Sequence, residues 1–255
     1  MKRTFSKGGR SAAILLLFLA VWETITRLVN IPNWLLPAPS AIVKTGVKVF
    51  PDFLPHFIAT VKLSLTGYLI GCGFGFFAAV CLHLLPKLKE AVYPFLILSQ
   101  NIPIIVLAPL LVIWFGFGIL PKIIIITLFC FFPVAVAALD GFRQVPHELR
   151  YYMEMAGATK SQLFLKLELP GSLPSIFSGL KISAAYSVMG AVVSEWIGAQ
   201  EGIGVFMTIA SSSFQTEKVF VAIFVIMALS LLFFLAIVLL EKRLMKWQPK
   251  GDDKR

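Results

Sequence analysis

Long apolar runs constrain this chain more than any other feature of its sequence. A helix needs about 20 mostly apolar residues to cross a bilayer. Hydrophobic residues make up 58% of the chain and charged residues only 14%, whereas a soluble domain carries about 25% charged residues. We therefore expect an all-α, polytopic membrane protein of about six transmembrane helices, forming a single transmembrane domain over residues 1–255. The six apolar segments are residues 12–29, 63–85, 92–115, 122–139, 176–197 and 219–240.

The first apolar segment is compatible with either a cleaved signal peptide or a retained helix. Four basic side chains within the first ten residues precede it, as in a signal peptide. However, Glu23, Thr24 and Arg27 follow the apolar run, and no small-x-small cleavage site is present. We expect a retained first helix in which Glu23 pairs with Arg27 one turn later.

The distribution of basic residues predicts the orientation in the membrane. With the N-terminus inside, most of the 23 Lys and Arg residues fall in inside segments. This asymmetry follows the positive-inside rule, so we expect both termini to be cytoplasmic. It also accounts for the net charge of +10 without a nucleic-acid partner. The outside segments hold only Lys44, Lys48, Lys62, Lys122 and Lys218, with Arg27 at a boundary.

The third apolar segment is interrupted by Asn101, Pro103 and Pro109. Prolines are tolerated in membrane helices where neighbouring groups satisfy the freed carbonyls. We therefore expect a kinked or broken helix packed inside the bundle. Gln100 and Asn101 at the break have two interpretations: they line a polar substrate pathway, or they form hydrogen bonds that hold the bundle together.

Glycine and proline mark two further stretches. Gly67, Gly71 and Gly75 recur every fourth residue, a spacing that lets two membrane helices approach closely. Residues 30–57 are rich in proline and are expected to form an extracytoplasmic connection. Within it, residues 40–50 are predicted to form a short helix capped by Ser40.

Residues 140–175 form the longest cytoplasmic loop, and their sequence predicts a helix–turn–helix. Pro146 suits the start of a helix over residues 147–156, and Gly157 stands where a glycine would end it. Thr159 and Gln162 have the spacing of a capping box for a second helix, which Pro170 is expected to end. No G-x-x-x-x-G-K-[ST] phosphate-binding loop occurs in the chain. The loop therefore either couples transport to an ATPase on another subunit or simply packs under the bundle.

The residues around Gly157 resemble the cytoplasmic signature of permeases of binding-protein-dependent ABC importers. That signature is Glu-Ala-Ala, three residues, Gly, and then a hydrophobic–x–Leu-Pro element, which here is Leu167 to Pro170. The Glu-Ala-Ala positions read Tyr151-Tyr152-Met153 instead, and Glu154 is out of register by three. The resemblance implies that the residues that couple to the ATPase are Tyr151, Glu154, Ala156, Gly157, Ala158, Leu169 and Pro170.

Other segments are similar to a narrower branch of these permeases, which serves nitrate, sulfonates, taurine and thiamine-pyrimidine precursors. The resemblance implies the type I ABC importer permease fold in a bacterial inner membrane. It implies two permease copies, expected to be a homodimer, two ATPase subunits and an extracytoplasmic substrate-binding protein. ATP and Mg²⁺ would bind to the ATPase, so we expect no cofactor in this chain and no enzymatic activity. The segments are 36–40, 103–110, 114–118 and 178–181.

The substrate is predicted from residues 195–207. The Glu195-Trp196-Ile197-Gly198 stretch and the glycine-rich segment after it are similar to importers of hydroxymethylpyrimidine or formylaminopyrimidine. Aliphatic sulfonates, taurine and nitrate remain alternatives. Glu195 and Trp196 are candidates for the substrate pathway because ionisable groups at membrane depth are costly. The alternative is that both residues lie at the membrane–water interface.

Two other classes of protein are less compatible with the sequence. A gradient-driven secondary carrier needs coupling carboxylates near the middle of the membrane, and a membrane-embedded enzyme needs a catalytic constellation. Neither is recognisable. His56, His83 and His147 are far apart in sequence, and the three Cys residues each lie in an apolar run, so we expect no metal site.

Overall fold

The computed structural model describes residues 2–245, and these residues form helices connected by short loops, without β-strands. The prediction of an all-α protein is confirmed. The helices, in chain order, are α1 (Lys2–Leu28), α2 (Pro39–Leu84), α3 (Pro86–Ser99), α4 (Ile104–Phe115), α5 (Ile119–Arg143), α6 (His147–Met155), α7 (Lys160–Leu163), the π-helix η1 (Phe164–Glu168), α8 (Leu169–Glu195), α9 (Ile203–Ser212) and α10 (Thr216–Leu244).

Four helical stretches of the described residues are long and apolar enough to cross a membrane. They are α2, α5, the continuous stretch Lys160–Glu195 and α10. The bent pair α3 and α4 makes a fifth if it is one span. The span predicted at residues 12–29 is helical as far as Leu28, as part of α1, but it is not among these five and stays a prediction.

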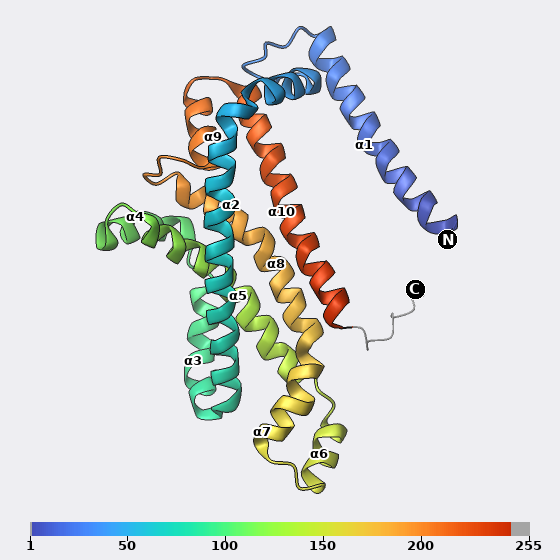
Figure 1. Ribbon diagram of the computed structural model, residues 1–255, viewed down its shortest axis with the longest axis vertical. Helices are drawn as coiled ribbons and strands as arrows, with labels where there is room; N and C mark the ends of the chain where they lie inside the picture. Colours follow the sequence, from blue (N-terminus) through green and yellow to red (C-terminus); the bar gives the residue numbers. More distant parts are fainter. Residues whose placement is uncertain (1, 246–255) are drawn as a thin grey trace.

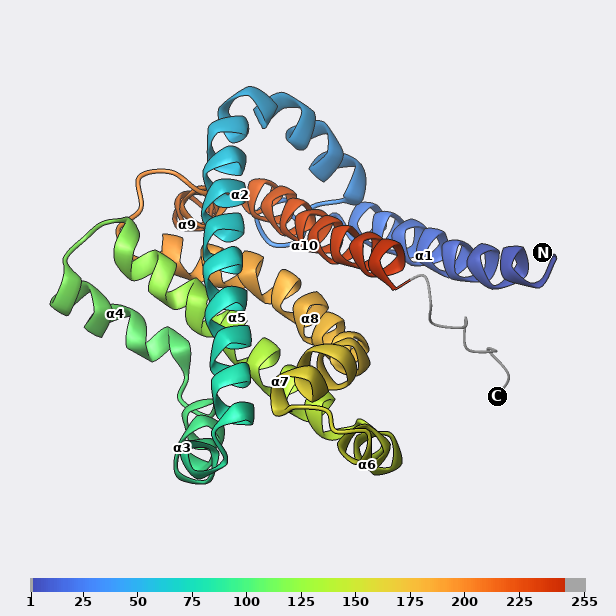
Figure 2. The ribbon, with the colours of Figure 1, turned by 60° about the horizontal axis from the view of Figure 1, so that its bottom comes forward.

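The core of the bundle forms where α5 packs between α2 and α8, with α10 against α8. Figure 2 shows α5, α8 and α10 running side by side, with α2 crossing them. Ile126, Cys130 and Val134 of α5 are fully buried at this junction, in contact with Tyr68 of α2 and Ala184 of α8. Helix α1 extends away from this core (Figure 1).

A carboxylate attaches α1 to the start of α2. Glu23 pairs with Arg27 as predicted, at 2.6 Å. Its carboxylate also accepts hydrogen bonds from the backbone N–H of Ser40 at 2.9 Å and from the Ser40 hydroxyl at 2.7 Å. The prediction that Ser40 caps its own helix is therefore wrong. The helix begins at Pro39, and Glu23 satisfies the free N–H of its first turn instead.

The helix predicted at residues 40–50 is not separate from the second span. A single helix of 46 residues, α2, runs through Pro51 and Pro55. In Figures 1 and 2 its first part lies across one end of the molecule, and the rest then turns along the bundle. Proline deforms a helix without ending it where the freed carbonyls find other partners.

The third predicted span is broken, as expected. Helices α3 and α4 meet at 101° across a break of four residues. The expectation that they are packed inside the bundle is wrong for this chain. Phe95 and Trp114 are 71% and 67% exposed, and only Leu96, Ala108 and Leu111 are buried. The bend lays the short α4 across α5, so that only a narrow face of α4 is covered.

The glycines of α2 lie where the predicted close approach occurs. A Cβ atom on Gly67 would lie 2.4 Å from Cγ2 of Ile126, and one on Gly75 would lie 2.6 Å from the carbonyl oxygen of Phe131. A Cβ atom on Gly71 would lie 2.7 Å from Cβ of Cys130. A Cβ atom on Gly73, on another face of the same helix, would meet nothing within 4 Å. The backbone of α2 therefore touches α5 along a single stripe.

We predict that Gly71→Val destabilises the protein, whereas Gly73→Val does not. The larger side chain at position 71 must displace Cys130 and the Thr127 backbone, at a cost of about 1–3 kcal/mol. Both substitutions replace glycine by valine within the same helix, so the change in helix propensity is the same and their difference reflects packing. Thermal unfolding of the detergent-purified variants measures it, and equal midpoints would contradict the close approach of α2 to α5.

Candidate functional site

The helix–turn–helix predicted at the cytoplasmic loop is present, with the expected local chemistry. Gly157 has φ +80°, a conformation that favours glycine, and the N–H of Ala158 donates to the Met153 carbonyl at 2.9 Å. The capping box is complete. The N–H of Gln162 donates to the Thr159 hydroxyl at 3.3 Å, and the N–H of Thr159 donates to the Gln162 side-chain oxygen at 2.9 Å.

The prediction that Pro170 ends the second helix is wrong. Helix α7, η1 and α8 form one continuous helical stretch from Lys160 to Glu195. The π-helical turn of η1 precedes Pro170, and the N–H of Leu169 donates to the Phe164 carbonyl, five residues earlier. A proline clashes with the carbonyl four residues before it in a regular α-helix. The wider π turn leaves room for the Pro170 ring.

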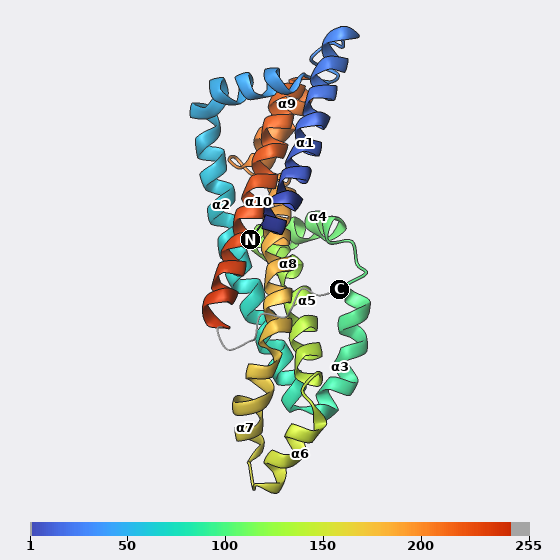
Figure 3. The same cartoon turned by 90° about the vertical axis from the view of Figure 1, so that its right-hand side faces the viewer.

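The predicted coupling residues divide into four exposed and three half-buried residues. Figures 1 and 3 show α6 and α7 projecting at one end of the molecule, opposite α9 and the start of α2. Tyr151, Glu154, Ala156 and Gly157 are exposed at the tip, with Tyr151 at 64%. The three remaining predicted residues are half-buried, and one of them, Leu169, packs against the core at the base of the loop. They are Ala158, Leu169 and Pro170.

Sequence reasoning missed a buried ionic cluster at the base of this loop. Glu168 is only 3% exposed and bonds both Arg150 of α6 and His83 at the end of α2. His83 and Glu168 lie 85 positions apart in sequence. Glu168 is the variable position of the hydrophobic–x–Leu-Pro element, and nothing in that element indicates a bond to His83. The signal available was Glu168 itself, an ionisable residue between two leucines, eight positions before a predicted membrane span.

At the opposite end of α8, Glu195 is 2% exposed and fully engaged. Its carboxylate accepts from the Thr60 hydroxyl of α2 at 2.7 Å and from the N–H of Gly204 at 2.8 Å. The Thr60 hydroxyl also accepts from the N–H of Ile203 at 2.8 Å. These bonds satisfy free N–H groups in the first turn of α9, where a negative charge is favoured. The contacts assign Glu195 to fixing α9 against α2 and α8.

Two glycines make room for this carboxylate. A Cβ atom on Gly202, which has φ +136°, would lie 2.2 Å from Cδ of Glu195. A Cβ atom on Gly204 would lie 2.5 Å from the Val192 carbonyl oxygen. Because these two glycines have no side chain, the start of α9 can contact the end of α8.

The structure does not bring the four predicted pathway residues together. Trp196 follows Glu195 at the end of α8 and is 44% exposed. Gln100 lines a separate cavity with Asp140 and Tyr186. The Asn101 amide, in the break after α3, donates to the Ile97 carbonyl of that helix at 3.2 Å. Glu195 and Gln100 border different cavities, so they do not form one site in this chain.

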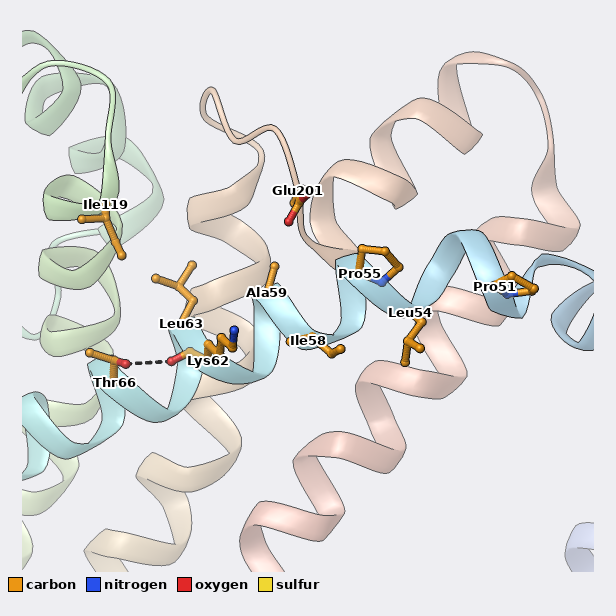
Figure 4. Close-up of a pocket in the computed structure, with 10 residues that line it drawn as sticks. All are labelled: Pro51, Leu54, Pro55, Ile58, Ala59, Lys62, Leu63, Thr66, Ile119 and Glu201. Atoms are coloured by element: carbon orange, nitrogen blue, oxygen red, sulfur yellow. Dashed lines mark hydrogen bonds between the residues drawn. The ribbon is translucent and has the colours of Figure 1, made fainter.

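Two adjoining cavities of about 570 and 420 Å³ lie near Glu195, and both are lined by Ala59, Leu63, Ile119 and Glu201. Figure 4 shows the larger one, in which Lys62 and Glu201 are the charged side chains among mostly apolar ones. Lys122 and Gln200 add polar groups to the smaller one. The sequence analysis treated Lys62 and Lys122 only as topological markers. Here Lys62 borders the larger cavity, and Lys122 borders the smaller one, which Glu195 also lines.

Within residues 2–245, no group of three His, Cys, Asp or Glu side chains is arranged to hold a metal ion.

Residues 71–246 match the model of the family described as the binding-protein-dependent transport system inner membrane component. The chain belongs to this family. It is a permease subunit of an ABC importer, a transport protein and not an enzyme, and a multi-pass protein of the inner membrane. Permeases of this family work with an ATPase and a substrate-binding protein.

Relatives and a solved structure agree with this assignment. The permease is 35% identical over 251 residues to the formylaminopyrimidine transport permease protein ThiX of Halalkalibacterium halodurans, covering 98% of this chain and all of that one. It is 30% identical to the taurine transport system permease protein TauC of Escherichia coli, covering 93% and 89% of the two chains. An amino acid ABC transporter crystallised with histidines shares the fold, with a TM-score of 0.65 at 19% identity over 77% of this chain and 96% of that one.

We predict that Thr60→Val destabilises the permease, whereas Thr66→Val on the same helix does not. The Thr60 hydroxyl is buried and joins Glu195 to the N–H of Ile203. Its loss leaves both groups short of a partner, at about 1–3 kcal/mol. The exposed Thr66 hydroxyl bonds only the Lys62 carbonyl of its own helix. Thermal unfolding in detergent checks this, and an unchanged midpoint for Thr60→Val would show that the cluster adds no stability.

Proposed function

We propose that this permease imports a pyrimidine precursor of thiamine, formylaminopyrimidine or hydroxymethylpyrimidine, driven by ATP hydrolysis on a separate ATPase subunit. The observation that carries the proposal is the similarity to the formylaminopyrimidine permease, which covers 98% of this chain and all of the other one. A second copy of this chain is expected to complete the pathway as a homodimer, with ATP and Mg²⁺ bound by the ATPase and both termini in the cytoplasm.

The charges around the two adjoining cavities support a neutral, polar substrate. The larger cavity is lined by one basic and one acidic side chain, Lys62 and Glu201. The smaller one has Lys122 against Glu195 and Glu201. A cavity built for a sulfonate would be expected to carry an excess of positive charge. A neutral heterocycle with amino groups and ring nitrogens can instead bond to both kinds of side chain.

Import of taurine or another aliphatic sulfonate is the second candidate. The observation in its favour is the similarity to the taurine permease, which is also nearly full-length. The two candidates differ in the charge of the substrate, so a direct comparison of uptake separates them.

We propose that α6 and the turn at Gly157 couple this subunit to the ATPase. No side chain of α6 is buried in this chain, and Tyr151, Tyr152 and Met155 are each at least 64% exposed. A short helix that presents aromatic and apolar side chains beyond the membrane bundle suits insertion into a groove on a partner. Capping at Gly157 and Thr159 fixes the direction in which this helix points.

Reconstituted transport tests the substrate. The tagged permease is purified with the subunits that accompany it, placed in proteoliposomes and supplied with labelled formylaminopyrimidine or labelled taurine. We expect ATP-dependent uptake of the pyrimidine and none of taurine. The reverse pattern would support the sulfonate candidate, and uptake driven by an ion gradient without ATP would refute the coupled importer.

We predict that Gly157→Val abolishes ATP-dependent uptake, whereas Gly157→Asn retains most of it. Valine is strained at φ +80°, by about 1–2 kcal/mol or more, whereas asparagine tolerates this conformation. A Cβ atom there meets nothing within 4 Å, so the difference between the variants reflects the backbone alone. Uptake is measured together with membrane insertion. Normal uptake by an inserted Gly157→Val variant would contradict the coupling role.

A further inference from the structure

One carboxylate at the base of the cytoplasmic loop bonds to two distant helices. Glu168 is the last residue of η1, directly before α8. Its Oε2 atom accepts a hydrogen bond from Nε2 of His83, in the last turn of α2, at 2.6 Å. Its Oε1 atom accepts from Nη2 of Arg150 in α6. The two oxygens of a single side chain thus join α6 to the ends of α2 and α8.

The two sides of this junction differ in how firmly they are held. The side chains of His83 and Glu168 are 12% and 4% exposed. The His83 ring lies 4.7 Å from the Phe142 ring and 5.8 Å from the Phe164 ring, measured between centroids. On this side, α2, α5 and η1 form one packed unit. The Arg150 side chain, by contrast, is 41% exposed.

Helix α6 has little else to attach it to the bundle. It buries no side chain. Among the residues that the structure describes, the Arg150–Glu168 pair is the one side-chain hydrogen bond or ion pair that joins α6 to another helix. A cavity of about 390 Å³ occupies space that side chains would otherwise fill. It is bordered by Arg150 and Glu168 and by Lys89 and Arg143. Apart from the pair, α6 is held by its two chain connections and by its contact with α7 across the Gly157 turn.

We propose that Glu168 is the positioning residue that transmits movement of α6 to the cytoplasmic ends of α2 and α8, with Arg150 and His83 as its partners. This inference rests on the proposed coupling role of α6. A buried carboxylate is costly without its hydrogen-bond donors, and the Arg150 guanidinium is one of them, so Glu168 and Arg150 stay paired as α6 moves. A displacement of α6 by the ATPase is then passed directly to the membrane helices. Without the pair, no side-chain bond of the described residues links α6 to these helices, and a displacement of α6 reaches them only through the chain connections.

The test uses the complete importer in proteoliposomes and measures both ATP hydrolysis and uptake of labelled formylaminopyrimidine, with taurine in parallel. Arg150→Met removes the charge from a half-exposed side chain and keeps its length. We expect the ATPase to remain bound and the uptake per ATP hydrolysed to fall by roughly threefold to thirtyfold. Arg150→Lys is expected to restore part of the ratio, because it keeps the positive charge.

Arg143→Met is the matched control, since it removes the same charge from the same cavity. Arg143 lies over the Tyr93 ring, at 5.1 Å, and has no ion pair with Glu168. It is expected to leave the uptake ratio unchanged. Glu168→Gln combined with Arg150→Met is expected to be no worse than the more severe single variant, because both remove the same link.

An unchanged ratio of uptake to hydrolysis in Arg150→Met would overturn the proposal. Loss of ATPase binding in that variant would also overturn it, because Arg150 would then be a docking residue. The Gly157→Val variant separates this inference from the function on which it rests. If Gly157→Val transports normally, the coupling role of α6 itself fails. If Gly157→Val is inactive and Arg150→Met keeps its ratio, only the role of Glu168 fails.

Discussion

The contact of α5 with α2 and α8 is the interaction on which the rest of the structure depends. Helices in lipid gain little from hydrophobic burial against one another, so they associate through close packing. Glycine provides it on both sides of α5: Gly71 of α2 lies against Cys130, and a Cβ atom on Gly179 of α8 would lie 2.7 Å from the Pro133 carbonyl oxygen. These three helices form a rigid unit. The other elements attach to it at their ends or along narrow faces.

Buried carboxylates hold two of these attachments, one at each end of α8. Glu168 directly precedes the helix and Glu195 is its last residue, and they are the two buried carboxylates of the part of the chain that the structure describes, with exposures of 3% and 2%. Each is satisfied by groups from other elements, as the cost of burying a charge requires. Glu168 holds α6, and Glu195 holds the start of α9. The two buried carboxylates therefore lie where a peripheral element meets the rigid unit.

Local chemistry could be predicted from the sequence, whereas contacts between distant segments could not. The turn at Gly157 and the capping box at Thr159 depend on neighbouring residues, and both were predicted correctly. The Thr60–Glu195 bond joins residues 135 positions apart, and no pattern in the sequence indicates it. The errors at prolines have another cause. In soluble proteins a proline such as Pro170 usually ends a helix. Here a π turn before it accommodates the proline ring, and the helix continues as α8.

The placement of the two carboxylates also bears on how a rigid helix can serve transport. Helix α8 has 27 residues and is about 40 Å long, comparable to the thickness of a membrane. Close-packed interfaces do not deform gradually, so a displacement applied at one end of such a helix moves its whole length. One end of α8 holds the loop proposed to meet the ATPase, and the other end fixes α9 beside the two adjoining cavities. Under the proposed function, a single rigid helix connects the energy source to the side of the permease where the substrate enters.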